Sequence, residues 1–142
     1  MTTGDDETLF WLPLKARTEV ATGTLQFSFD RPAKMVFKAG QFMDMTLVDP
    51  PETDAEGNTR GFSINSAPDD SELVFTTRLR DTAFKRVLRA MPLGTKVKLE
   101  GPFGNFTLHN NASRPAVMIA GGIGVTPFRS VVHRAAHEHL DH

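Results

Sequence analysis

The sequence predicts a mainly β protein: a small antiparallel Greek-key barrel of about six strands with one helix, followed by an incomplete α/β segment. Three observations support this prediction. Short runs in which apolar and polar residues alternate recur along the first hundred or so positions, which is typical of half-buried strands. One helical pattern interrupts them. After Arg114 the pattern changes to a continuous apolar run and a glycine cluster.

Composition limits the classes of function. The 142 residues suffice for one core of ordinary size, and the net charge of −1 gives no general attraction to nucleic acid or to a membrane surface. The absence of cysteine excludes disulfides, iron–sulfur ligation and thiol catalysis from this stretch, and it fits a cytoplasmic location. Nowhere do about 18 apolar residues follow one another, so no membrane-spanning helix is expected. Residues 1–8 are polar, lack the pattern of a signal peptide and are expected to be loose.

The strands of the predicted barrel are read from their period. Leu9–Ala21 and Thr24–Asp30 are expected to form a hairpin whose turn is Thr22-Gly23. Strands are also expected at Phe42–Val48 and Leu73–Leu79.

A loop, a helix and one more strand complete this region. The acidic, proline-containing segment Asp49–Thr59 reads as an exposed loop. Asp81 is the expected N-cap of the helix, and Pro92 follows its end. A strand around Val97 and Leu99 leads into Gly101-Pro102. The helix itself is indicated by apolar residues at positions i, i+3, i+4 and i+7, which are Phe84, Val87, Leu88 and Met91.

The last 29 residues resemble the start of a different domain. Val117–Ala120 is a short apolar run, as in a strand buried on both faces of a parallel sheet. After the glycines, Thr126 and Pro127 are expected to cap and begin a helix that runs toward Leu140. One strand and one helix make a single β-α unit, so residues 117–132 are expected to pack on the barrel or to dimerise by strand exchange.

Four motifs in a fixed order give the sequence a specific resemblance. Ala39–Phe42 contains a glycine-glutamine step, and Arg60–Ser66 reads RGFSINS. Gly101–Phe106 reads GPFGNF, and Ala120–Pro127 reads AGGIGVTP. Together they resemble the flavin motif, the barrel-closing turn and the glycine-rich nucleotide turn of the ferredoxin–NADP⁺ reductase family. The resemblance covers about residues 9–140, with Phe62 where that family usually has tyrosine.

The resemblance implies a function and a division of the chain. Residues 9–113 would be an FAD-binding barrel, and residues 114–142 would be the truncated start of an NAD(P)-binding domain. The complete enzyme would pass a hydride from NAD(P)H to flavin N5, and electrons would continue to an acceptor such as ferredoxin or flavodoxin. An acidic redox protein is a possible partner, and NAD(P)H turnover is expected only in a complete chain.

Three residues of the second motif have the clearest implied roles. Arg60 would hold the FAD pyrophosphate, because a guanidinium presents paired donors and keeps its charge. Phe62 would stack against the flavin ring, and Ser63 would hydrogen-bond N5. Both are the predicted catalytic residues. Because neighbouring side chains of a regular strand point to opposite faces, both reach the flavin only if the strand bends or bulges, which Gly61 would ease.

The remaining implied contacts are spread along the chain. The start of the helix would offer free amides to a phosphate, although Phe84 and Lys85 stand where the family often has glycine and serine or threonine, and an Asp81 cap would compete for those amides. Thr126 could hydrogen-bond the nicotinamide nucleotide. The further cofactor-binding residues implied by resemblance are Gly61, Ile64, Asn65, Ser66, Thr76, Thr77, Arg78, Thr82, Ala83, Phe84, Gly122, Gly124 and Thr126.

Several alternatives stay open from sequence. The basic run Arg78–Arg89 could steer an anionic cofactor or be a solvated helix face. His133 and His137 lie one helical turn apart, but no known zinc pattern accompanies them, so no metal is predicted. The barrel could also be an FAD-free interaction module, or an FMN-type domain of an oxygenase reductase.

Overall fold

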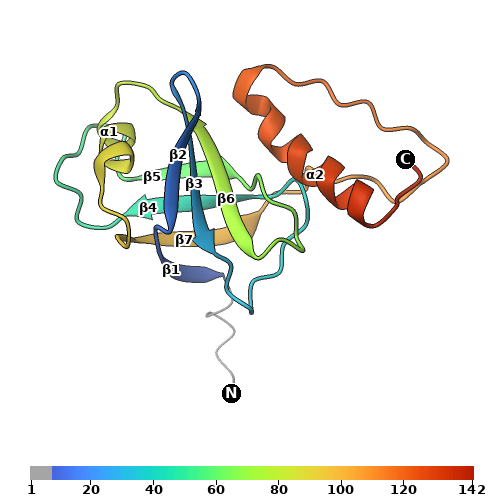
Figure 1. Ribbon diagram of the computed structural model, residues 1–142, viewed down its shortest axis with the longest axis horizontal. Helices are drawn as coiled ribbons and strands as arrows, with labels where there is room; N and C mark the ends of the chain where they lie inside the picture. The colour runs from blue at the N-terminus through green and yellow to red at the C-terminus, as the bar shows by residue number, and fades with distance from the viewer. Residues whose placement is uncertain (1–7) are drawn as a thin grey trace.

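The computed structural model describes residues 8–142, so the expectation of a loose segment at residues 1–8 lies outside it except for Thr8. These residues form two antiparallel sheets, one short helix beside them, and a C-terminal helix (Figure 1). The strands are β1 (Leu9–Pro13), β2 (Ala16–Ala21), β3 (Thr24–Asp30), β4 (Phe42–Leu47), β5 (Thr59–Ser63), β6 (Glu72–Arg78) and β7 (Lys96–Phe103). The helices are α1 (Ala83–Ala90), the 3₁₀ turn η1 (Gly122–Val125) and α2 (Thr126–His137).

The two sheets make a barrel that is linked at its corners and is not hydrogen-bonded all the way round. One sheet has the order β1-β7-β4-β5, and the other has the order β2-β3-β6. Lys15 N–H donates to the Ser28 carbonyl at 2.9 Å at one corner, and Asn65 N–H donates to the Val74 carbonyl at 2.8 Å at another. The expected mainly β, antiparallel fold is confirmed.

The first predicted strand was wrong in one respect. Leu9–Ala21 is two strands, because the chain turns at Leu14 and passes from one sheet to the other. Leu14 is 1 % exposed, and its N–H donates to the Thr95 carbonyl at 2.9 Å, which fixes the turn. The predicted hairpin with Thr22-Gly23 is confirmed between β2 and β3, with Gly23 at φ 69°.

The core lies between the two sheets and is rich in phenylalanine. Period-two alternation places Phe27 and Phe29 of β3 and Phe75 of β6 on the inner face, each at most 1 % exposed. Their rings pack at centroid separations of 5.8 to 6.3 Å. Helix α1 closes one end of this core with Phe84 and Leu88.

The start of α1 differs from the prediction by one residue. Thr82, not Asp81, is the N-cap: its Oγ1 accepts a hydrogen bond from Lys85 N–H at 3.3 Å. The carboxylate of Asp81 instead pairs with Arg86. Both residue types can cap a helix, so the sequence pattern alone does not distinguish them.

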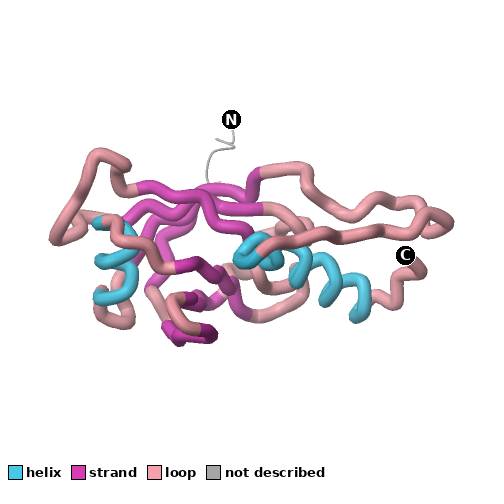
Figure 2. The backbone as a smooth tube through the Cα atoms, turned by 90° about the horizontal axis from the view of Figure 1, so that it is seen from above, coloured by secondary structure: helices cyan, strands magenta, loops and turns pink. Residues whose placement is uncertain are grey.

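The C-terminal segment contains the predicted helix without the predicted strand. Residues 104–121 run as an extended loop beside α2, away from the barrel sheets (Figure 2). Val117 and Ile119 are 84 % and 86 % exposed, and no strand is assigned to Val117–Ala120. A strand of this kind needs neighbouring parallel strands to pair with, and residues 8–142 provide none beside it. No helix among these residues is long and apolar enough to cross a membrane.

Candidate functional site

Two adjoining cavities, each of about 310 Å³, lie where β5, β6, α1 and η1 meet. They share four lining residues, so we treat them as one groove, the β5–α1 groove. Its lining includes most of the second sequence motif and part of the glycine-rich motif. The shared residues are Arg60, Thr77, Lys85 and Ile123.

Arg60 is anchored at the edge of the groove by its own loop. Its Nη1 donates to the carbonyls of Glu56 and Thr59 at 2.8 Å and of Gly57 at 3.2 Å, and its Nη2 pairs with the Glu56 carboxylate at 2.8 Å. The guanidinium also lies 5.2 Å from the centroid of the Phe84 ring. The three carbonyls fix its orientation, while the Glu56 carboxylate is an anion that another anion could replace.

Phe62 and Ser63 reach the groove without a bulge. β5 pairs with β4 in continuous register from Thr59 to Ser63, so the expected distortion at Gly61 is absent. Phe62 is 6 % exposed and belongs to the core, and Ser63 is the last residue of β5 and is half-buried. Both line the same cavity because the strand ends there. The resemblance predicts that Phe62 stacks against the flavin ring, whereas in the structure most of its side-chain surface packs against other core residues.

Lys85 is a groove residue that the sequence indicates in two ways, as part of the helix-start segment and as part of the basic run Arg78–Arg89. Its ammonium lies 4.8 Å from the Phe62 ring centroid and contacts the Thr77 hydroxyl. Burial lowers the pKa of Lys85 to about 8, with smaller contributions from the positive charges of Arg60 and Arg80. Among residues 8–142, no carboxylate lies within ion-pair distance of this ammonium.

The first amide of α1 is already occupied. Ala83 N–H donates to Asp54 Oδ2 at 2.8 Å, and the other oxygen of that carboxylate accepts from Glu56 N–H at 2.9 Å. The bond from Ala83 is the largest cause that lowers the pKa of Asp54. The predicted phosphate seat at the start of this helix is therefore partly filled by the protein's own carboxylate. Ala83 and Phe84 are buried and do not line the groove, whereas Thr82 does.

Other predicted residues divide between the groove and the interior. Thr77 lines both cavities, Thr76 lines one of them and Arg78 lines the other. Ile64 is fully buried in the core, so its predicted cofactor contact is not supported by its position. Asn65 and Ser66 lie beyond the strand end and make structural hydrogen bonds.

Two of those bonds hold α2 against the barrel, and the other two join residues 65 and 66 to β6. Asn65 Nδ2 donates to Thr76 Oγ1 at 3.0 Å, and the Asn65 carbonyl accepts from Arg129 at 2.8 Å. The Ser66 hydroxyl accepts from Val74 N–H at 3.0 Å, and the Ser66 carbonyl accepts from Ser130 at 2.6 Å. Residues 117–132 were expected either to pack on the barrel or to dimerise by strand exchange. The part of them in α2 packs on the barrel. Asn65 Oδ1 is a buried acceptor without a partner among residues 8–142.

The glycine-rich turn forms the wall of the groove opposite β5. Gly124, Thr126 and Pro127 line the cavity together with Ile123, while Gly122 does not line it. The Thr126 hydroxyl donates to the Ile123 carbonyl at 3.1 Å, so Thr126 tightens the turn and does not cap α2 as expected. Ile123 was missed from sequence because a single apolar residue between glycines gives no signal of its position.

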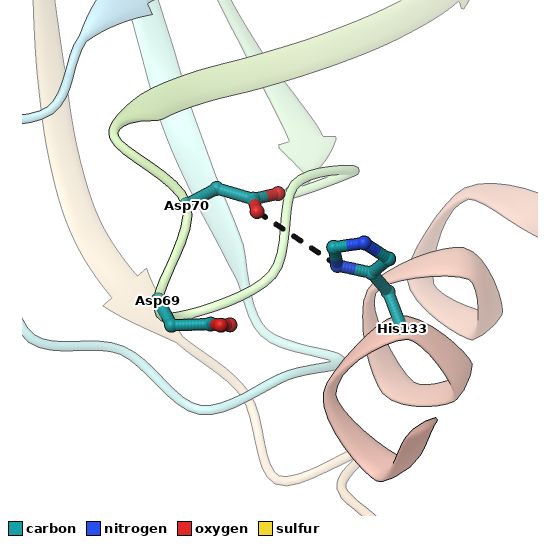
Figure 3. Close-up of side chains that lie close together, drawn as sticks. All are labelled: Asp69, Asp70 and His133. Atoms are coloured by element: carbon teal, nitrogen blue, oxygen red, sulfur yellow. Dashed lines mark ion pairs between the residues drawn. The ribbon is translucent and has the colours of Figure 1, made fainter. Parts of the chain in front are cut away.

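Two histidines of α2 lie beside two carboxylates of the loop before β6, and Figure 3 shows one of them, His133, with Asp69 and Asp70. His137 Nδ1 lies 2.6 Å from Asp69 Oδ2, and His133 Nδ1 lies 3.8 Å from Asp70 Oδ1. Asp70 also accepts from Ala67 N–H at 2.8 Å through its other oxygen. These contacts bring α2 against the loop before β6.

Comparison with known proteins gives a consistent class of relatives. No protein-family model matches the chain. Over 100 residues it is 36 % identical to methane monooxygenase component C of Methylosinus trichosporium, covering 69 % of this chain and 28 % of that protein. Over 111 residues it is 33 % identical to ferredoxin–NADP reductase B of Sorangium cellulosum, covering 75 % and 44 %. The chain thus spans less than half the length of each of these relatives.

Solved structures share the fold. Phthalate dioxygenase reductase superposes with a TM-score of 0.76 at 20 % identity, over 98 % of this chain and 43 % of that one. A ferredoxin NADP⁺ reductase from Neisseria gonorrhoeae, with bound FAD and NADP, gives a TM-score of 0.67 at 20 % identity, over 94 % and 54 %. The barrel fold and these relatives place the chain in the class of flavoprotein reductase modules. The chain belongs to the ferredoxin–NADP⁺ reductase-like family.

Proposed function

We propose that this chain is the FAD-binding part of an NAD(P)H-dependent oxidoreductase. The β5–α1 groove is the observation that supports this most strongly: residues of the flavin motif and of the glycine-rich turn, more than fifty positions apart, line one cavity. When bound, FAD supplies the N5 atom that accepts a hydride from NAD(P)H. The protein's own residues bind and orient it.

Each groove residue has a role that its position allows. Arg60 is already oriented by three carbonyls, so it can exchange the Glu56 carboxylate for a phosphate without moving far. Ser63 is half-buried at the strand end, where its hydroxyl can donate to or accept from a flavin nitrogen. Phe62 and Ile123 present apolar surface that excludes water.

The partners of the whole protein are part of the proposal. We infer that residues 9–113 are the flavin domain and that residues 114–142 begin a nicotinamide-nucleotide domain. The relatives' names favour an oxygenase component or a ferredoxin as electron acceptor. A cytoplasmic location is part of the proposal and fits the absence of cysteine. The exposed Val117 and Ile119 would then meet further strands of a longer protein or, as a second possibility, another copy of this chain.

The first experiment is an FAD titration followed by flavin fluorescence anisotropy, with Arg60→Ala and Arg89→Ala as matched variants. Arg89 is exposed in the last turn of α1 and does not line the groove. We expect saturable binding that Arg60→Ala weakens by about 1.5–3 kcal/mol, as for a lost charged hydrogen bond, and that Arg89→Ala leaves unchanged. Folded protein that binds no flavin would support the alternative of an FAD-free interaction module, whereas tighter binding of FMN than FAD would support the FMN-type domain.

A further inference from the structure

The N-terminus of α1 is a poor place for a phosphate in this protein. Two of its first-turn amides are taken: Ala83 N–H by the Asp54 carboxylate at 2.8 Å and Lys85 N–H by the Thr82 hydroxyl at 3.3 Å. The amide bonds to Asp54 hold the pKa of its carboxyl below the usual value, so it stays charged at neutral pH. A phosphate approaching these amides would have to displace or repel this carboxylate.

Lys85, in the first turn of the same helix, carries a cation that has no counter-ion among residues 8–142. The Lys85 ammonium is half-buried in the groove between the Thr77 hydroxyl and the Phe62 ring. The other basic residues of α1 are differently placed: Arg86 pairs with Glu52 and Asp81, and Arg89 is exposed. Because a buried charge is costly unless it is paired, the position of Lys85 suits the binding of an anion in the groove.

The basic side chains that line the groove can balance two negative charges of a bound ligand. Arg60 and Lys85 line both of its cavities, and Arg78 and Arg80 line one of them. Four charged groups line the groove with Lys85: Arg60 from β5, Arg78 from β6, Arg80 from the segment before α1, and Glu56 from the loop before β5. Glu56 is committed to Arg60 at 2.8 Å. These side chains carry an excess of positive charge, which the negative charge of a diphosphate would balance.

We propose that Lys85 and Arg60 hold the diphosphate of the bound flavin nucleotide through side-chain charge, in place of the amides of α1 that Asp54 occupies. This inference rests on the proposed function for the identity of the nucleotide. It also assigns a consequence: anion binding holds Lys85 in its protonated form, so the protein takes up protons when it binds the nucleotide near pH 8.

The experiment compares wild type with Lys85→Met and with Lys34→Met, a lysine that is exposed and outside the groove. Affinities for FAD, riboflavin and inorganic pyrophosphate are measured by calorimetry at pH 7 and pH 8, in two buffers of different ionisation enthalpy. We expect Lys85→Met to weaken FAD and pyrophosphate by about ten- to a hundredfold, as for a lost charged hydrogen bond, and to leave riboflavin within about twofold. Proton uptake at pH 8 should occur in wild type and in Lys34→Met, and should be lost in Lys85→Met.

Two results would overturn the inference. Lys85→Met could bind FAD and pyrophosphate as tightly as wild type, or it could lose riboflavin in the same proportion as FAD. Failure of the proposed function looks different: wild type would then bind neither FAD nor riboflavin, while pyrophosphate binding would still report whether Lys85 forms an anion site. Circular dichroism of each variant confirms that it is folded before affinities are compared.

Discussion

The Ser130 hydroxyl donates to the Ser66 carbonyl at 2.6 Å, and the two side chains are 0 % and 1 % exposed. This bond joins the end of the flavin motif to the helix that follows the glycine-rich turn. Together with the bond from Arg129 to the Asn65 carbonyl, it holds α2 on the barrel, next to the turn whose Ile123 and Gly124 line the groove.

Removing this bond should loosen α2. Ser130→Ala leaves the Ser66 carbonyl buried without a donor, which costs about 1–3 kcal/mol. We expect faster hydrogen exchange across α2 and η1 and little change in the barrel strands, measured by mass spectrometry. Val132→Ala, at an exposed position of the same helix, is the control. Uniform loosening of the whole chain would contradict a local role for this contact.

Substitutions of Phe62 and Ser63 should affect different properties: Phe62→Ala the free energy of unfolding, and Ser63→Ala the interaction with flavin. Phe62 packs against Phe27 at 5.5 Å and Phe84 at 5.9 Å between ring centroids, so Phe62→Ala should cost about 3–5 kcal/mol in urea unfolding. Ser63→Ala removes a half-buried hydroxyl at a strand end and should change stability by less than about 0.5 kcal/mol while altering the flavin absorbance spectrum. Equal destabilisation by the two substitutions would show that Ser63 is a packing residue.

The lowered pKa of Lys85 predicts a pH dependence of stability. In the folded chain the pKa is about 8, against 10.5 for the free side chain, so the folded state disfavours the charged form. The penalty is complete below pH 8, and it fades as the pH rises to 10.5, where the unfolded chain also loses the proton. The full difference corresponds to about 3 kcal/mol, which solvent screening of a half-exposed group reduces to about 1 kcal/mol.

Lys85→Met should therefore be more stable than wild type at pH 7 by about 1 kcal/mol, and the gap should close toward pH 10.5. Urea unfolding at several pH values measures it. Lys34→Met supplies the baseline for an exposed lysine. A gap that stays constant with pH would mean that lost packing, and not charge, explains the difference.

Asp54 should affect the pH dependence of stability in the opposite way to Lys85, because its charged form stabilises the folded state. Its bond from Ala83 N–H lowers its pKa, so the stability it contributes is present above the free value of 3.8 and is lost as the pH falls through the lower, folded value. Asp54→Asn should weaken the start of α1 at pH 7 and should make acid unfolding less dependent on pH in that range. Thermal melting at pH 3 and pH 7 measures both effects, with Asp141→Asn as an exposed control.

Gly40 is the glycine whose replacement should matter most for the barrel. It has φ 104°, and a Cβ there would lie 1.8 Å from the Phe106 carbonyl oxygen, so Gly40→Ala should cost at least about 2 kcal/mol. Gly57 has φ 76° with nothing within 4 Å of an added Cβ, so Gly57→Ala should cost only about 1 kcal/mol of backbone strain. Equal melting temperatures for the two variants would contradict the close approach of residues 40 and 106.

Local patterns were enough to predict much of the site. Arg60, Phe62 and Ser63 belong to one strand and one motif, so the sequence predicts that they share a site, and all three line the β5–α1 groove. The alternation of Leu25, Phe27 and Phe29 likewise predicted a half-buried strand, because a strand's period fixes which side chains share a face, and these three residues are buried in β3.

Contacts between distant segments were the ones that sequence reasoning missed. Asp54 reaches the Ala83 amide from an acidic loop 29 positions earlier, and nothing in that loop marks one carboxylate over its neighbours. The charge environment of Lys85 depends on β5 and on the segment before α1 together. Val117–Ala120 has the composition of a buried strand, but strand formation depends on partners that residues 8–142 do not place beside it.

The most direct test of the central claim, that a flavin nucleotide binds in the β5–α1 groove, is an FAD titration of isotope-labelled protein followed by amide chemical shifts. The account predicts the largest shifts at Ser63, Thr77 and Gly124, with smaller shifts at Lys85 and none in β1 or the outer part of the loop after β7. Shifts confined to another surface, or none at FAD concentrations that saturate its relatives, would contradict it.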